Sequence, residues 1–240
     1  MRNKWFIALK YRGEDIYDFS DLTILESPPN IYWADPFLAE HEGKTYCFFE
    51  QYDYEKGCIA VGELDGLEIK NVKKILDEPW HMSFPSVVQE GENYYMTPER
   101  CLAGSLWIYK CERFPDVWNM HHHVANGRYD DPILRKVSNG WQIWATEDNK
   151  LVVFEAQTLR GEWRVIKRED KPFMRNAGHF IGDLRPTQDC IPVYGRAMKI
   201  LDGDRIVREI EPDWMPNLTG THTLNVTEKY VVVDGRIKLS

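Results

Sequence analysis

The sequence contains few cysteines and none of the spacings that mark a metal or disulfide site. The five are Cys47, Cys58, Cys101, Cys111 and Cys190, an odd number without a CxxC pair. This usage is typical of reduced thiols in a cytoplasmic protein, and it argues against a disulfide framework and against a zinc site. We therefore expect no disulfide bond and a cytoplasmic location.

Long apolar runs, excess positive charge and phosphate-binding loops are also lacking. The apolar stretch near the N-terminus, WFIAL, is too short for a signal peptide or a membrane span. With 38 acidic against 30 basic residues the formal net charge is −8, so duplex nucleic acid is not an expected partner. No GxGxxG and no GxSxG occurs, which excludes a dinucleotide fold of that type and a serine nucleophile elbow.

A degenerate repeat runs through the chain instead. Three copies each contain a proline, an apolar pair, a polar turn with glycine, an aromatic-rich run and a glutamate. They are ADPFLAEHEGKTYCFFE at 34–50, SFPSVVQEGENYYMTPE at 83–99 and DDPILRKVSNGWQIWATE at 130–147, and their prolines, Pro36, Pro85 and Pro132, are spaced by 49 and 47 residues. Weaker copies are GHFIGDLRPTQDC at 178–190 and HTLNVTEKYVVVDG at 222–235.

Five units of roughly 48 residues fill the chain, and this period suits a propeller blade of about four strands. Short runs rich in β-branched and aromatic residues alternate with turns, and no long stretch shows helical periodicity. The sequence therefore predicts an all-β, five-bladed β-propeller that forms one domain over 1–240 and has very little helix. The first segment, KWFIALKY, is expected to close the ring against the last blade.

Several ordered motifs resemble one known family. These are YWADPFLAEHEGKTYCFFEQY, HMSFPSVVQEGENYYMTPE, RPTQDCIPVYGRAM and GTHTLN. They are similar to the propeller domain at the N-terminus of glucosamine inositolphosphorylceramide transferases and their bacterial relatives, within the five-bladed superfamily that includes glycoside hydrolase family 43. The resemblance covers about residues 30 to 237 and implies a funnel at the propeller axis that takes a sugar.

Family 43 enzymes use three carboxylates, and the resemblance carries two of them over. Asp35 in WADP matches the base of blade one, and Asp131 in YDDP matches the second carboxylate in blade three. The acid expected at the opening of blade four is missing, because RNAGHFIGD contains no glutamate. Glu99, in the motif MTPER, is the candidate to replace it or to bind sugar hydroxyls. Because Asp35 precedes Pro36, an extended backbone is expected there.

Other residues are candidates for substrate binding. Trp33 adjoins Asp35 and offers a ring for stacking on a sugar face. His81 at the entry of blade two is a candidate donor to a sugar hydroxyl or a phosphate. His222 at the opening of blade five is a second candidate, and the resemblance implies that it supports a single metal ion near the axis through water. The C-terminal half adds a polar group that fits a pyrophosphate cradle for a nucleotide-sugar or, alternatively, neutralises the funnel carboxylates: Arg175, Arg185, Gln188, Asp189, Tyr194 and Arg196.

Three functions follow from these features. The first is glycosyl transfer from an activated donor, favoured by the transferase resemblance, the absent blade-four glutamate and the arginines. The second is hydrolysis of the family 43 kind, and the third is a non-catalytic sugar-binding module. The sugar, the acceptor and the linkage stay open at this point.

Overall fold

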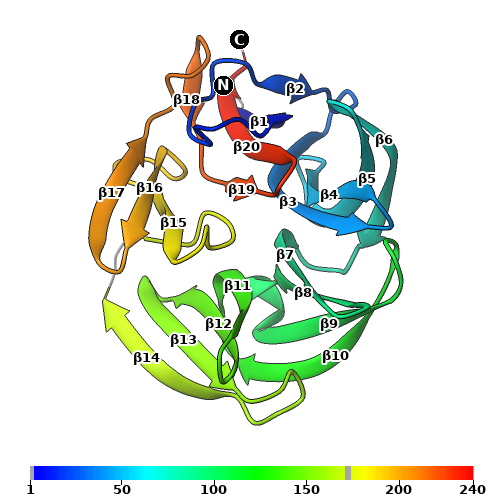
Figure 1. The fold of residues 1–240 in the computed structure, drawn as a ribbon, viewed down its shortest axis with the longest axis vertical. Coiled ribbons are helices and arrows are strands. Elements are labelled where there is room, and N and C mark those ends of the chain that lie inside the picture. Colours follow the sequence, from blue (N-terminus) through cyan, green and yellow to red (C-terminus); the bar gives the residue numbers. More distant parts are fainter. Residues whose placement is uncertain (1–2, 171–173, 240) are drawn as a thin grey trace.

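The computed structural model describes residues 3–170 and 174–239, which form a ring of five small sheets around a central axis (Figure 1). Neighbouring strands within the sheets are antiparallel. Within the described residues the helical content is one turn of 3-10 helix, η1 (Cys101–Ala103), and no helix there is long and apolar enough to cross a membrane. The predicted all-β, five-bladed propeller is confirmed.

The first three blades are meanders of four strands. Blade one contains β3 (Tyr32–His41), β4 (Lys44–Tyr52), β5 (Gly57–Asp65) and β6 (Glu68–Leu76). Blade two contains β7 (Ser83–Glu90), β8 (Asn93–Glu99), β9 (Ser105–Arg113) and β10 (Val117–Asn126). Blade three contains β11 (Asp130–Val137), β12 (Gly140–Glu147), β13 (Lys150–Ala156) and β14 (Arg164–Asp170). In each blade the first strand lies nearest the axis (Figure 1).

Blade five is assembled from both ends of the chain. It contains β18 (Leu218–Gly220), β19 (Leu224–Val226), β20 (Tyr230–Lys238), β1 (Asn3–Tyr11) and β2 (Thr23–Leu25). Strand β1 pairs with β20 along its whole length, from Asn3 opposite Lys238 to Tyr11 opposite Tyr230. The expected closure of the ring by the first segment is therefore confirmed. Closure leaves no free edge between the first and last blades.

In blade four the strand that contains the proline is not the innermost strand, unlike the arrangement that the repeat suggests. Its strands are β15 (Leu184–Asp189), β16 (Ala197–Asp202) and β17 (Arg205–Ile210). The inner position is taken by residues 175–178, whose Asn176 forms a bridge with Thr187. Pro186 therefore lies in the second position from the axis, and its carbonyl accepts from the N–H of Ala177 at 3.0 Å. It is not the counterpart of Pro36.

Most of the apolar core lies between neighbouring blades, where the faces of adjacent sheets pack together. One cluster joins blades one and two through Phe37, Phe48, Met82, Phe84 and Met96, all fully buried. Similar clusters join blades five and one, two and three, and four and five. Blade contacts of this kind hold the inner strands in fixed positions around the axis.

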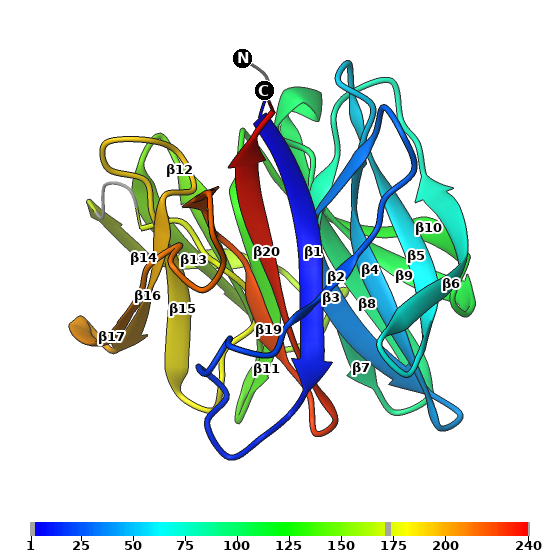
Figure 2. The ribbon, with the colours of Figure 1, turned by 90° about the horizontal axis from the view of Figure 1, so that it is seen from above.

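Seen from the side, the inner strands run between two ends of the propeller (Figure 2). The chain termini and η1 lie at one of these ends (Figure 2). Strands β3, β7 and β11 begin, and β4, β8 and β12 end, at this same end. The polar side chains at those strand ends can therefore meet there.

Candidate functional site

A backbone feature repeats at the start of three inner strands. Asp35, Phe84 and Asp131 each precede a proline and have positive φ angles of 51°, 49° and 46°. The strand register shifts at each of these places, as expected for a β-bulge. The extended backbone expected at Asp35 is therefore wrong. Aspartate tolerates the left-handed region better than most residues, and a bulge re-aims the side chain that it carries.

Asp35 is held at the axis by two hydrogen-bond donors from other blades. The hydroxyl of Thr223 donates to its Oδ1 at 3.0 Å, and the N–H of Phe84 donates to its Oδ2 at 3.2 Å. The residue is only 5% exposed. Burial raises the pKa of Asp35 to about 6, with nearby His222 opposing the rise and Asp234 adding to it. The carboxyl can therefore change charge close to neutral pH.

His222 and Asp234 form a buried pair behind Asp35. The Nδ1–H of His222 donates to Asp234 Oδ2 at 2.6 Å, and His222 Nε2 lies 3.8 Å from Asp35 Oδ1. The His222 ring stacks on Trp5 at 3.9 Å between centroids. Burial opposes protonation of His222, but the carboxylates of Asp234 and Asp35 outweigh it and raise its pKa. A protonated His222 favours the ionised form of Asp35.

Asp234 is fully buried and accepts several hydrogen bonds. Its Oδ1 accepts from the backbone N–H of His222 at 2.8 Å and of Thr223 at 3.0 Å. Its Oδ2 accepts from the backbone N–H of Asp35 at 3.3 Å and from the His222 ring. Asp234 thus links β20 to the start of β3 and holds both Asp35 and His222 in place. The sequence analysis missed it, although a lone aspartate in the β-branched run YVVVDG is an unusual residue for a buried strand.

Asp131 lies in a second cluster with Arg175 as its cation. The Nε–H of Arg175 donates to Asp131 Oδ2, and Nη2 donates to Glu99 Oε2 at 2.9 Å. Gln188 Nε2 donates to Asp131 Oδ2 at 2.8 Å, and the N–H of Asp131 donates to Glu99 at 2.8 Å. Burial raises the pKa of Asp131 well above its usual value, while Arg175 lowers it. Asp130 lies 3.8 Å from Arg175 Nη1, so both aspartates of the YDDP motif approach the same guanidinium.

Glu50 is a further buried carboxyl that the sequence analysis treated only as a repeat position. Its Oε1 is buried and has no hydrogen-bond partner within the described chain, although His81 Nε2 lies 3.3 Å away. His81 Nδ1 accepts from the N–H of Gly57 at 3.0 Å. Burial, together with Asp35, raises the pKa of Glu50 well above its usual value, and burial lowers that of His81. Both shifts favour the neutral form of the side chain.

The remaining arginines of the expected cradle are engaged separately. Arg185 donates to Asn176 Oδ1 at 2.9 Å and to the carbonyl of Met174 at 3.0 Å, and it is buried. Arg196 forms an ion pair with Asp189 at 2.7 Å and another with Glu211. Of the three arginines, only Arg175 forms a described contact with the carboxyls near the propeller axis. The structure therefore does not gather the three guanidinium groups into one cradle.

Two expected aromatic residues have different surroundings. Tyr194 is 45% exposed, and its ring lies 5.4 Å from the His222 ring, beside the axial site. The guanidinium of Arg175 also lies 5.4 Å from the Tyr194 ring. Trp33 is only 3% exposed and packs against Phe49 in the core. Trp33 therefore presents no open face for a sugar, because its ring is used in packing.

The site does not fit a directly bound metal ion. Asp35, His222 and Asp234 bring ligand atoms within 4.8 Å of one another. However, both oxygens of Asp234 already accept N–H groups, and His222 Nδ1 is one of their donors. A second group, Glu99, Cys101 and Asp130, contains a thiol whose pKa burial raises to about 11. We therefore derive no chemistry from a metal ion.

Comparisons with known proteins agree with the fold. The family described as "Glucosamine inositolphosphorylceramide transferase 1, N-terminal" matches residues 20–209. The rice protein glucosamine inositolphosphorylceramide transferase 1 (Oryza sativa subsp. japonica) is 29% identical over 203 residues, which is 75% of this chain and 27% of that protein. The Arabidopsis thaliana protein of the same name is 28% identical over 194 residues, or 72% of this chain and 25% of that protein. This chain thus spans about a quarter of these relatives.

Solved structures share the architecture at low identity. A family 117 glycoside hydrolase of Zobellia galactanivorans has a TM-score of 0.59 and 11% identity, over 96% of this chain and 90% of that one. A family 32 β-fructofuranosidase of Bombyx mori has a TM-score of 0.57 and 13% identity, over 96% of this chain and 56% of that one. At these identities the likeness shows the propeller fold alone.

Proposed function

Because this chain belongs to the family of the N-terminal part of glucosamine inositolphosphorylceramide transferases, we propose that it binds a sugar at the propeller axis and catalyses glycosyl transfer. One observation carries the proposal. Asp35 is a buried carboxyl with a pKa of about 6, held by Thr223 and Phe84 beside the His222–Asp234 pair. A general base is most effective when its pKa lies near the working pH.

The proposed step needs only one base at the axis. Asp35 takes the proton from an acceptor hydroxyl while the acceptor oxygen forms a bond to the anomeric carbon of the donor sugar. The bond from that carbon to the leaving phosphate breaks, and the phosphate keeps the electron pair, so it needs no proton. A nucleotide-sugar is the donor class that we propose. The inner segment of blade four provides Arg175 and Asn176 rather than a carboxyl, which agrees with a reaction without a blade-four acid.

Glu50 supports hydrolysis as a second candidate. Burial raises the pKa of Glu50, and Asp35 can ionise close to neutral pH. Glycoside hydrolases use two carboxyls of this kind, one as acid and one as base. In that reaction Glu50 gives its proton to the leaving oxygen, and Asp35 takes a proton from the attacking water. Strand pairing places Glu50 opposite Ala34, next to Asp35 in the chain.

The limited share of the relatives that this chain spans supports a third candidate, a sugar-binding module. About three quarters of the rice and Arabidopsis proteins lie outside the matched region. The Asp131 and Glu99 carboxyls are already neutralised by Arg175, as suits a site that only binds. In this case the wild-type protein binds a sugar and shows no turnover.

A ligand screen followed by a turnover assay separates the three candidates. Ligands that bind only the folded state raise the apparent melting temperature. Glycosyl transfer requires that a UDP- or GDP-sugar stabilises the protein and that the sugar then appears on an added acceptor mixture, detected by mass spectrometry. Release of free sugar from glycans supports hydrolysis instead. Stabilisation by sugars without any turnover supports the binding module and contradicts both enzymatic candidates.

A further inference from the structure

Three arginines are almost fully buried, and one of them differs from the others. Arg100, Arg185 and Arg236 are only 4%, 6% and 5% exposed. Arg185 donates to Asn176 and to a backbone carbonyl, and Arg236 donates to Thr219 and to a backbone carbonyl. The Nε and Nη1 groups of Arg100, by contrast, are buried and have no hydrogen-bond partner in the described part of the chain.

Two further unpartnered donors lie beside Arg100. Its guanidinium carbon is 5.1 Å from the ring centre of Trp80 and 5.9 Å from that of Tyr109. The indole N–H of Trp80 and the hydroxyl of Tyr109 are also buried without a hydrogen-bond partner. Burial raises the pKa of Tyr109 to about 12, with the charge of Arg100 and a contact of its guanidinium with the phenol oxygen acting against the rise, so the phenol keeps its proton. Apart from this contact, the Nε–H and Nη1–H groups of Arg100, the indole N–H of Trp80 and the O–H of Tyr109 have no acceptor in the described part of the chain.

Such an arrangement is costly unless an acceptor is provided from outside. A buried charge normally has an ionic or hydrogen-bonded partner, and a buried donor without an acceptor destabilises the folded state. No carboxylate forms an ion pair with Arg100 among residues 3–170 and 174–239, whereas Arg175 and Arg196 each have at least one. The rings of Trp80 and Tyr109 lie against the guanidinium, and a negatively charged acceptor is the partner that best fits its free N–H groups.

The geometry points to an oxyanion site at Arg100, Trp80 and Tyr109 that takes a phosphate group. A guanidinium presents a fork of donors that matches phosphate oxygens, and the indole and phenol add single donors beside it. A tetrahedral phosphate has enough oxygens to accept from all three side chains, whereas a carboxylate has two. The free anion and the phosphate ester of a sugar offer the same chemistry to these donors.

The site lies beside the axial carboxyls but is separate from them. Arg100 directly follows Glu99 at the end of β8, and Trp80 directly precedes His81. Arg100 lies against Trp80 and Tyr109, which pack in the buried cluster that joins blades one and two, so its guanidinium is placed at that cluster. The assignment does not depend on the proposed glycosyl transfer, because no axial residue takes part in it.

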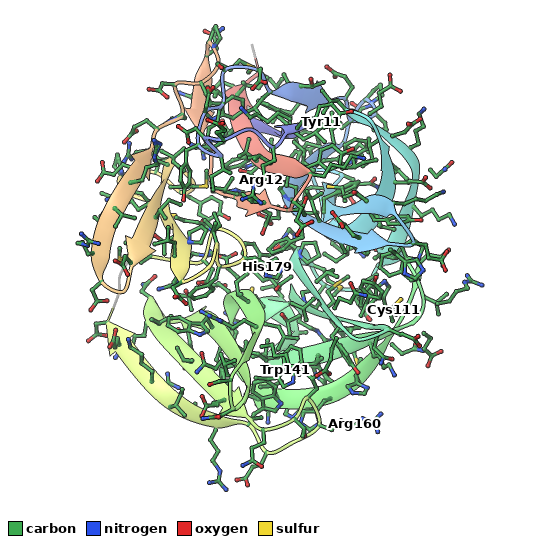
Figure 3. All side chains as sticks on the ribbon, viewed as in Figure 1. Tyr11, Arg12, Cys111, Trp141, Arg160 and His179 are labelled. Carbon is green, nitrogen blue, oxygen red and sulfur yellow. The ribbon has the colours of Figure 1, made fainter. Side chains whose placement is uncertain are left out.

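Calorimetric titration with inorganic phosphate tests the site, with sodium chloride held at matched ionic strength. Wild-type protein should bind phosphate, and Arg100→Met should weaken this binding by about 10- to 100-fold, the scale of charge-assisted hydrogen bonds. Arg160→Met is the matched control. Arg160 lies at the outer edge of the ring (Figure 3) and contacts only His121 in the bonds described, so its loss should leave phosphate binding unchanged.

Two conservative variants keep the test decisive if Arg100→Met does not fold. Trp80→Phe and Tyr109→Phe each remove one donor and keep a ring, so each should weaken phosphate binding by a few-fold. Wild-type protein that binds no phosphate, or a response to chloride equal to that of phosphate, overturns the assignment. So does unchanged phosphate affinity in folded Arg100→Met. Tighter binding of a sugar 1-phosphate than of inorganic phosphate identifies the ester as the ligand, and equal binding identifies the free anion.

Discussion

Substitution of Asp35 by asparagine tests the axial site without knowledge of the substrate. The φ angle of 51° is tolerated by asparagine as well as by aspartate. The amide oxygen can still accept from the N–H of Phe84, and the hydroxyl of Thr223 can rotate to accept from the amide nitrogen. We therefore expect Asp35→Asn to fold and to lose only the titratable charge.

The size of the effect follows from the pKa. Burial raises the pKa of Asp35 from 3.8 to about 6. The folded state thus binds this proton more tightly than the unfolded state, and the group stabilises the protein fully below about pH 4. This stabilisation is lost as pH rises through about 6, and two pKa units correspond to about 3 kcal/mol. At pH 7.5 Asp35→Asn should therefore be more stable than wild type by up to about 3 kcal/mol, and near pH 4 the two should be equal.

Urea unfolding at the two pH values measures this difference, provided that the m-values agree. Asp213→Asn, at an exposed position, is the control and should behave like wild type at both. A stability difference that is the same at pH 4 and pH 7.5, or a destabilised variant at pH 7.5, refutes the reasoning. Where a turnover assay exists, Asp35→Asn should also lower activity by ~10²–10⁴. Wild-type activity should rise with pH through about 6, as Asp35 ionises.

Three further variants test the surroundings of Asp35. Asp234→Asn turns an amide N–H toward N–H donors, among them the ring of His222, and should destabilise the protein by about 3–5 kcal/mol, measured by urea unfolding. Gly57→Ala places a Cβ 2.5 Å from Glu50 Oε1 and should cost about 1–3 kcal/mol, whereas Gly13→Ala meets nothing within 4 Å and should be neutral in the same assay. Glu50→Gln replaces a carboxyl whose pKa burial raises with an uncharged group of similar shape, so its stability at pH 7 should stay within about 1 kcal/mol of wild type. A large loss of stability in Glu50→Gln contradicts the raised pKa of Glu50.

The fold could be predicted because each blade is specified by residues that lie close together in the sequence. A proline, an apolar pair, a glycine turn and an aromatic run recur at nearly constant spacing, and each copy became an inner strand followed by its neighbour in blades one to three. Blade four was harder to place, because its inner position is filled by the short segment 175–178 without a proline. The repeat identified the blade but not which of its strands faces the axis.

The site residues could be predicted only where the repeat determines their position in a blade. Asp35 and Asp131 lie at equivalent bulges, as the alignment of their motifs indicated. The contribution of Asp234 depends on its hydrogen bond with the N–H of Asp35, a long-range contact that no local pattern reveals. Burial was equally hidden, which is why Trp33 was expected to stack on a sugar face and Arg185 was a candidate for a phosphate cradle.

The bulge at the start of the inner strand carries a different residue in different blades. These residues determine where an anionic ligand can bind. In blades one and three it carries a carboxyl, Asp35 or Asp131, while in blade two it carries Phe84 and contributes an N–H. Asp234 and Glu99 add further carboxyls, and the cations in contact with this group are Arg175 and His222. Burial strengthens repulsion between like charges, so a phosphate placed at the axis would be strongly disfavoured.

A donor phosphate bound by this protein therefore has to lie away from the axial carboxyls. Arg100 is the buried arginine of the described residues whose Nε and Nη1 groups have no acceptor, and it stands one residue from Glu99. If glycosyl transfer occurs here, the neutral sugar belongs with Asp35 and the charged group with Arg100. Loss of phosphate binding in Arg100→Met together with intact sugar binding would be the expected signature of this division.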